Sequence, residues 1–166
     1  MFDLHTPSLN RGRLVEISGL PATTINNWNA AGRLPLYAHA PGGSGRPRLY
    51  TRGEAIACSV VAALDRVGAS RDWTPVLAHT VISKVEELEG DEPMRRLDGT
   101  TSLVIENPFP LMDKPCLEKF GYLLSEEDAA EYVAHRLPSV PVLAMPFGSI
   151  VNRANADFQR IVGRIE

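Results

Sequence analysis

Residues 11–33 read RGRLVEISGLPATTINNWNAAGR, and the expected fold class follows mainly from their pattern. Apolar side chains at helical spacing predict a short first helix, and Gly19 predicts its end, because glycine accepts the left-handed backbone found after many helices. Pro21, followed by the threonines at 23 and 24, predicts the start of a second helix. Ile25 and Trp28 are three residues apart, so both face inward and the asparagines between them face outward. The stretch is therefore typical of two helices joined by a tight turn.

The next residues, from 33 to 50, are too rich in glycine and proline to form a long helix. Residues 34–38 and 46–50 flank a Gly-rich tip and can pair as a two-stranded hairpin. A third helix is expected over residues 51–67, where apolar residues, Val67 included, return at helical spacing. Two helices, a hairpin and a third helix in this order are typical of a winged helix-turn-helix. Such a unit commonly places its second helix in the major groove of DNA.

Beyond this unit the pattern changes. A fourth helix is expected over residues 71–88, and the polar residues 89–93 are the best candidate for a domain boundary. The remaining chain predicts a strand (101–106), a Pro-rich loop (107–115), a second strand (140–145) and a last helix (149–164). Between the loop and the second strand, a helix is expected to about residue 137, with Ser125 as its N-cap and acidic residues in its first turn. Pro141 favours an edge position for the second strand. We therefore expect a mainly α protein, with a winged helix-turn-helix domain at residues 1–90 and a small α+β domain at residues 91–166.

Charge is distributed unevenly along the chain, whose formal net charge is −3. Residues 1–52 hold six arginines against two acids, for a net charge of +4, and residues 53–166 carry −7. A basic end on an acidic body is expected where one end of a protein meets phosphates. Chance clustering is the alternative explanation.

Several classes of protein are disfavoured by composition. Two cysteines make no disulfide framework, and four scattered histidines lack the short ligand spacings of a metal site. No catalytic constellation or phosphate loop stands out, so we expect neither an enzyme nor a cofactor. No apolar run approaches the ~20 residues of a membrane span. The first residues lack the features of a signal peptide, and we expect a cytoplasmic protein that does not enter membranes.

A family resemblance follows from the spacing of small motifs in residues 11–90. These motifs are Gly19-Leu20, Thr24-Ile25, Trp28, Gly32, Arg48-Leu49-Tyr50-Thr51, Glu54-Ala55, Leu64 and Gly68-Ala69-Ser70. In this pattern the chain resembles the MerR family of winged-helix regulators, which implies a DNA-binding N-terminal half. Two departures are clear: Asn26-Asn27 stand where the family usually has Arg-Tyr, and residues 91–166 do not resemble the long coiled-coil helix that typically follows.

The candidate DNA-binding residues are polar or basic side chains of the second helix and the hairpin. On the helix, Thr23, Thr24, Asn26 and Asn27 would lie near base edges. Asparagine can make a paired contact with adenine. Arginines that bracket the Gly-rich tip would hold phosphates. The full set is Arg13, Thr23, Thr24, Asn26, Asn27, Arg33, Arg46, Arg48, Tyr50 and Arg52. The alternatives are a solvated surface for the polar residues and a core position for the Tyr50 ring.

The last helix carries apolar residues at alternating steps of four and three, which is the spacing of a coiled-coil seam. The seam predicts a homodimer through Val151, Ala154, Phe158, Ile161 and Ile165. The alternative is that these side chains pack within their own domain.

Together these patterns predict a sequence-specific protein that binds double-stranded DNA, most simply a transcriptional regulator acting as a dimer. The C-terminal domain would then dimerise, or bind a small-molecule or protein effector. A phage-type DNA-packaging factor of the small terminase kind, or an excisionase-like factor, is the alternative.

Overall fold

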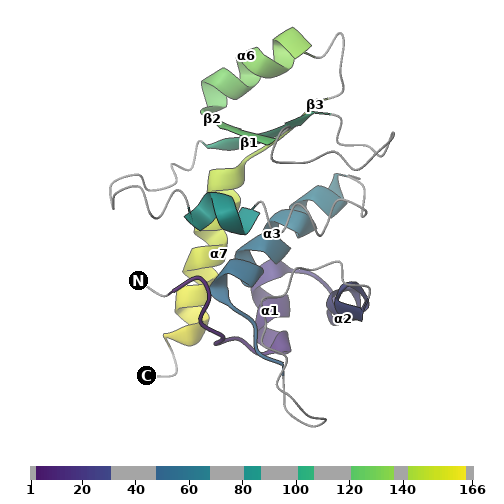
Figure 1. The fold of residues 1–166 in the computed structure, drawn as a ribbon, viewed down its shortest axis with the longest axis vertical. Helices are drawn as coiled ribbons and strands as arrows, with labels where there is room; N and C mark the ends of the chain where they lie inside the picture. The colour runs from purple at the N-terminus through teal and green to yellow at the C-terminus, as the bar shows by residue number, and fades with distance from the viewer. Residues whose placement is uncertain are drawn as a thin grey trace.

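The structure is a computed structural model that describes residues 3–30, 48–67, 81–86, 101–106, 121–136 and 142–163. These residues are mostly helical, with a small three-stranded antiparallel sheet at one end (Figure 1). The elements are α1 (Arg11–Ser18), α2 (Ala22–Ala30), α3 (Arg52–Arg66), β1 (Ser102–Glu106), β2 (Gly121–Leu124), α6 (Glu126–Arg136), β3 (Val142–Met145) and α7 (Phe147–Val162). Residues 81–86 are also helical. The expected mainly α composition is thus confirmed for the described part of the chain.

The two expected N-terminal helices are present as α1 and α2. The side chain of Asn10 caps α1 by accepting a hydrogen bond from the backbone N–H of Arg13 at 3.0 Å. Gly19 ends α1 in the left-handed conformation, with a φ of 70°, which confirms its predicted role. After a turn of three residues α2 begins at Ala22 and buries Ile25 and Trp28, the two predicted inward residues.

Among the helices that the structure describes, α3 has the largest buried fraction. Thr51 and Glu54 form a reciprocal capping box at its start. The N-terminal segment crosses α3 at Gly53, whose N–H donates to the Leu4 carbonyl at 3.0 Å. A Cβ added at Gly53 would lie 3.2 Å from the same oxygen, so a larger residue would crowd this contact. Val67 was expected to face inward, but it follows the end of the helix and is 59% exposed.

The sheet has the strand order β2-β1-β3, with β1 in the centre and antiparallel to both neighbours. Leu103 of β1 lies opposite Leu123 on one side and Met145 on the other. The two predicted strands are confirmed as β1 and β3, and β3 lies at an edge as expected. β2 was not predicted. Helix α6 packs on the sheet. The Ser125 hydroxyl caps its start by accepting a hydrogen bond from the Asp128 N–H at 3.0 Å.

Helix α7 runs from the sheet back along α3 to α1 (Figure 1). The start of α7 is hydrogen-bonded to the residue before β1, since the Gly148 N–H donates to the Thr101 carbonyl at 2.8 Å. One hydrophobic core extends from the N-terminal helices through α7 to β1 and β3. The core is therefore continuous across the expected boundary at residue 90, and the division into two domains stays a prediction.

The apolar row of α7 points into this core. Four of the five predicted dimer residues are buried within the chain; they are Val151, Ala154, Phe158 and Ile161. These side chains therefore pack within their own chain, which was the alternative to a dimer seam, because α3 and α1 cover the row. The fifth residue, Ile165, lies outside the described residues, as do the expected hairpin tip, the first part of the fourth helix, the boundary at 89–93 and the Pro-rich loop.

Candidate nucleic-acid interface

Helix α2 presents a polar face to solvent. Its buried residues, Ile25 and Trp28, lie on one side of the helix. Thr23, Asn26 and Asn27 are exposed on the other side, as the helical period of 3.6 requires. Thr24 and Asn29 lie at the flanks and are half-buried. Three of the four helix residues predicted to contact bases thus share one exposed face, and Thr24 does not.

An open hollow of about 680 Å³ lies beside this face. It is formed by the start of α1, the second half of α2 and the chain just before α3. Its described lining residues are Asn10, Arg11, Gly12, Asn26, Asn29, Ala30, Arg48 and Tyr50. Two of these side chains are guanidinium groups, and none of the described lining residues is acidic. Such a lining suits a phosphate or another anion, which arginine binds through paired N–H donors.

Two hydrogen bonds fix the polar side of α2 in this hollow. Arg11 Nη1 donates to Asn26 Oδ1 at 3.2 Å, which links α1 to α2. One turn further on, Asn29 Nδ2 donates to the Tyr50 hydroxyl at 3.1 Å. Tyr50 is itself held by backbone pairing with Leu9, where the Tyr50 N–H donates to the Leu9 carbonyl at 2.7 Å. α2 is therefore positioned by polar contacts as well as by its apolar stripe.

The remaining predicted residues divide into three groups. Tyr50 lines the hollow, but its ring is 2% exposed, which is the predicted core alternative, and its hydroxyl is bonded to Asn29. Arg48 is half-buried and lines the hollow, whereas Arg13 is half-buried and is not among the lining residues. Arg33 and Arg46 lie outside the described residues.

Arg52 corrects one expectation of the sequence analysis. It was grouped with the phosphate-binding arginines, but it is 5% exposed and its Nη1 donates to Asn155 Oδ1 of α7 at 2.9 Å. A side chain enclosed in this way does not reach a surface ligand. Arg52 joins α3 to α7 instead.

Three polar lining residues, Asn10, Arg11 and Asn29, were not predicted from the sequence. Asn10 and Arg11 stand at the start of α1, and Asn29 lies one turn after Asn26. The period of α2 could have indicated Asn29, because residues three apart share one side of a helix. Nothing in the local pattern indicated Arg11, whose place depends on the packing of α1 beside α2.

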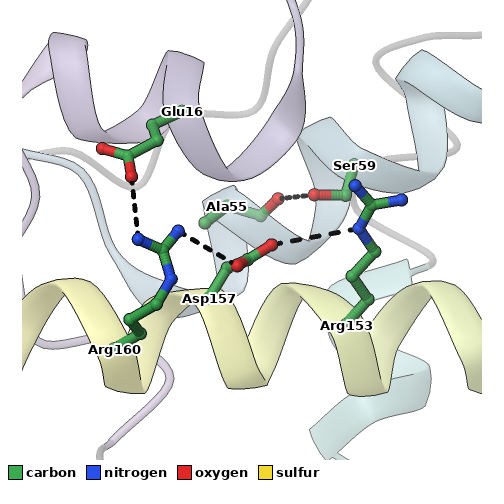
Figure 2. Close-up of polar contacts among 6 residues, drawn as sticks. All are labelled: Glu16, Ala55, Ser59, Arg153, Asp157 and Arg160. Atoms are coloured by element: carbon green, nitrogen blue, oxygen red, sulfur yellow. Dashed lines mark hydrogen bonds and ion pairs between the residues drawn. The ribbon is translucent and has the colours of Figure 1, made fainter.

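Polar contacts also join α1 to α7, on the surface next to the core (Figure 2). The Arg160 guanidinium of α7 lies 3.1 Å from Asp157 and 3.1 Å from Glu16 of α1. Its hydrogen bonds with Asp157 and Glu16 raise the pKa of Arg160. Arg153 lies 4.0 Å from the same aspartate. Exposed pairs of this kind contribute little stability, and the buried Arg52–Asn155 bond is the stronger polar link to α7.

A second, smaller hollow of about 340 Å³ lies along α6. Its described lining includes Tyr132 and Arg136, whose guanidinium carbon lies 5.7 Å from the centre of the tyrosine ring. Asp128, Glu131 and His135 complete the polar side.

Within the described ranges, no three His, Cys, Asp or Glu side chains are grouped so that they could hold a metal ion. Cys58 is enclosed in α3, and burial raises the pKa of its thiol above the usual value. None of the helices in this part of the chain is long and apolar enough to cross a membrane. A comparison with protein-family models finds no match, and a comparison with curated protein sequences finds none either.

Proposed function

We propose that this protein binds double-stranded DNA with sequence specificity, through a winged helix-turn-helix of the MerR-like kind. The observation that carries the proposal is the exposed polar face of α2 beside a hollow that holds two arginines and no described acid. The major groove of B-DNA is about 12 Å wide and admits one α-helix. Helix α2 would enter it with Thr23, Asn26 and Asn27 near base edges.

The arginines of the hollow would contact the DNA backbone. Arg11 and Arg48 both line the hollow that also includes Asn26 and Asn29 of α2, so a phosphate seated there would meet two guanidinium groups. Arginine binds phosphate through two parallel N–H groups, and these contacts set the register of a protein on the duplex. The net charge of +4 on residues 1–52 and −7 on the rest would orient the N-terminal end toward DNA.

Transcriptional regulation as a homodimer is the simplest role for such a protein. One short helix reads few base pairs, so useful specificity comes from two copies on a symmetric site. Because α3 and α1 cover the inward row of α7, we propose that the two copies meet through another surface. Light scattering with a symmetric duplex should give a complex with two chains of 18.1 kDa per duplex. A single chain per duplex at saturation would contradict the dimer.

The experiment that tests DNA binding is selection from a random duplex library at low salt, followed by affinity measurements on the enriched and scrambled duplexes. The logarithm of the affinity should fall linearly with the logarithm of salt concentration. Arg48→Ala should weaken binding to both duplexes alike. The matched control is Arg153→Ala, whose side chain lies on α7 and is 85% exposed, and it should bind as the wild type does. Wild-type protein that retains no duplex at low salt would overturn the proposal.

A further inference from the structure

We propose that Arg11 sets the amide orientation of Asn26, so that Asn26 reads a keto base, guanine or thymine, in preference to adenine. The inference rests on the proposed function and concerns the specificity of the same surface. Arg11 Nη1 lies 3.2 Å from Asn26 Oδ1, and both residues line the hollow.

The chemistry of arginine decides which way the amide points. A guanidinium group has five N–H donors and no acceptor, so only the oxygen of Asn26 can face it. The amide NH₂ group then points away from α1. Asn26 is exposed, so this NH₂ group is available to a ligand on the outer side of α2.

A second hydrogen bond, one turn further along α2, helps to hold Asn26 in place beside Arg11. Asn29, on the same side of the helix one turn later, donates to the hydroxyl of the buried Tyr50. Polar contacts therefore hold this edge of α2 at two successive turns. Asn27 is next in sequence but about 100° further round the helix, so it faces away from both contacts.

The base edges of the major groove distinguish the two amide orientations. Adenine is read by asparagine through two bonds, in which the amide oxygen accepts from N6 and the amide nitrogen donates to N7. An Asn26 oxygen engaged by Arg11 is less able to accept from N6, whereas its NH₂ group still donates to guanine O6 and N7 or to thymine O4. Wild-type protein should therefore prefer a keto base at the position that Asn26 contacts.

The experiment is binding-site selection from a random duplex library with the full chain and its variants Arg11→Ala, Asn26→Ala, Asn26→Asp and Asn27→Ala. Asn26→Ala locates the base pair, because the preference there should fall on the order of fivefold. At that base pair Arg11→Ala should admit adenine, since the freed amide can turn over. Asn26→Asp, which has acceptors only, should change the preference from keto bases to the amino bases cytosine and adenine.

The double variant Arg11→Ala/Asn26→Ala separates positioning from simple phosphate binding. If Arg11 acts through Asn26, adding Arg11→Ala to Asn26→Ala changes affinity but no longer changes base preference. Paired with Asn27→Ala, which is the matched control, Arg11→Ala should still change the preference at the Asn26 base pair. Arg11→Ala that weakens all duplexes alike and leaves every base preference intact would overturn the inference while leaving DNA binding in place. Wild-type protein that enriches no duplex would overturn the proposed function and the inference with it.

Discussion

Helices α2 and α3 belong to the same N-terminal region, yet they differ sharply in burial. Eleven of the 15 residues of α3 are buried, whereas α2 buries two of nine. α3 is packed against α1 and α7, and the N-terminal segment crosses its start. α2 is attached along one stripe and by two side-chain hydrogen bonds. The difference indicates that α3 provides stability, and that α2 is free to present side chains to a partner.

Two arginines four residues apart show the same contrast. Arg52 starts α3 and is buried against α7, whereas Arg48 precedes it and lines the open hollow. Residue type and sequence neighbourhood are nearly the same for both. Their different roles come from what packs over them: α7 covers Arg52, whereas Arg48 lies beside the hollow.

The largest effect is expected for chemical labelling of Cys58 in α3. The thiol is buried and burial raises its pKa, so both access and the reactive thiolate are suppressed in the folded protein. In a Cys116→Ser background, labelling by a thiol reagent should be slower than in urea by about 10³- to 10⁶-fold, because it requires global unfolding. Mass spectrometry over time measures the rate. Native labelling as fast as in urea would show that α3 opens locally, which would remove the contrast with α2.

Phe158→Ala in α7 should lower the free energy of unfolding by about 3–5 kcal/mol, because the ring is 2% exposed in the core and its loss leaves a cavity. Urea denaturation measures the change. The control is Gln159→Ala on the exposed side of the same helix, with an expected change within about 0.5 kcal/mol. If Phe158→Ala left stability unchanged but converted a dimer to a monomer in light scattering, the α7 row would be a dimer interface after all.

Arg52→Met should lower the free energy of unfolding by about 1.5–3 kcal/mol. The substitution keeps much of the apolar volume but removes the donor to Asn155 and the hydrogen bond that joins α3 to α7. The matched variant Arg48→Met should change stability by about 0.5 kcal/mol or less and should weaken DNA binding. Equal losses of stability in both variants would mean that Arg48 is as structural as Arg52.

Local signals in the sequence were sufficient for elements whose ends carry a cap. Gly19, the Ser125 cap and the Ile25–Trp28 pair each act within one helical turn, and the structure confirms them. β2 was missed because its place in the sheet depends on pairing with β1, which its own four residues do not indicate. The burial of Arg52 was also unpredictable, because its partner lies 103 residues away.

Only the part of the candidate site that depends on local sequence could be predicted. The exposed face of α2 follows from helical period, so Asn26 and Asn27 could be found from the sequence. The hollow depends on Leu9 pairing with Tyr50, 41 residues away, which places the chain before α3 against α1 and α2. Arg11 therefore entered the site only with the tertiary structure. The arginines of the expected hairpin at 33 and 46 stay a prediction.

The smallest effect on stability is expected on the outer face of α2, for Asn27→Ala. The side chain is exposed and alanine favours a helix, so the free energy of unfolding should change by no more than about 0.5 kcal/mol. On DNA the same change should cost about 1–3 kcal/mol at particular base pairs and little elsewhere. Urea denaturation and competition binding with single-base variants of the selected site measure the two quantities side by side. The substitution should change DNA binding but not stability, because the Asn27 side chain is not packed in the core and is therefore available to a partner. Loss of stability with unchanged DNA preference would place Asn27 in the fold, and the contrast between the two helices would then fail at the position where it is expected to be clearest.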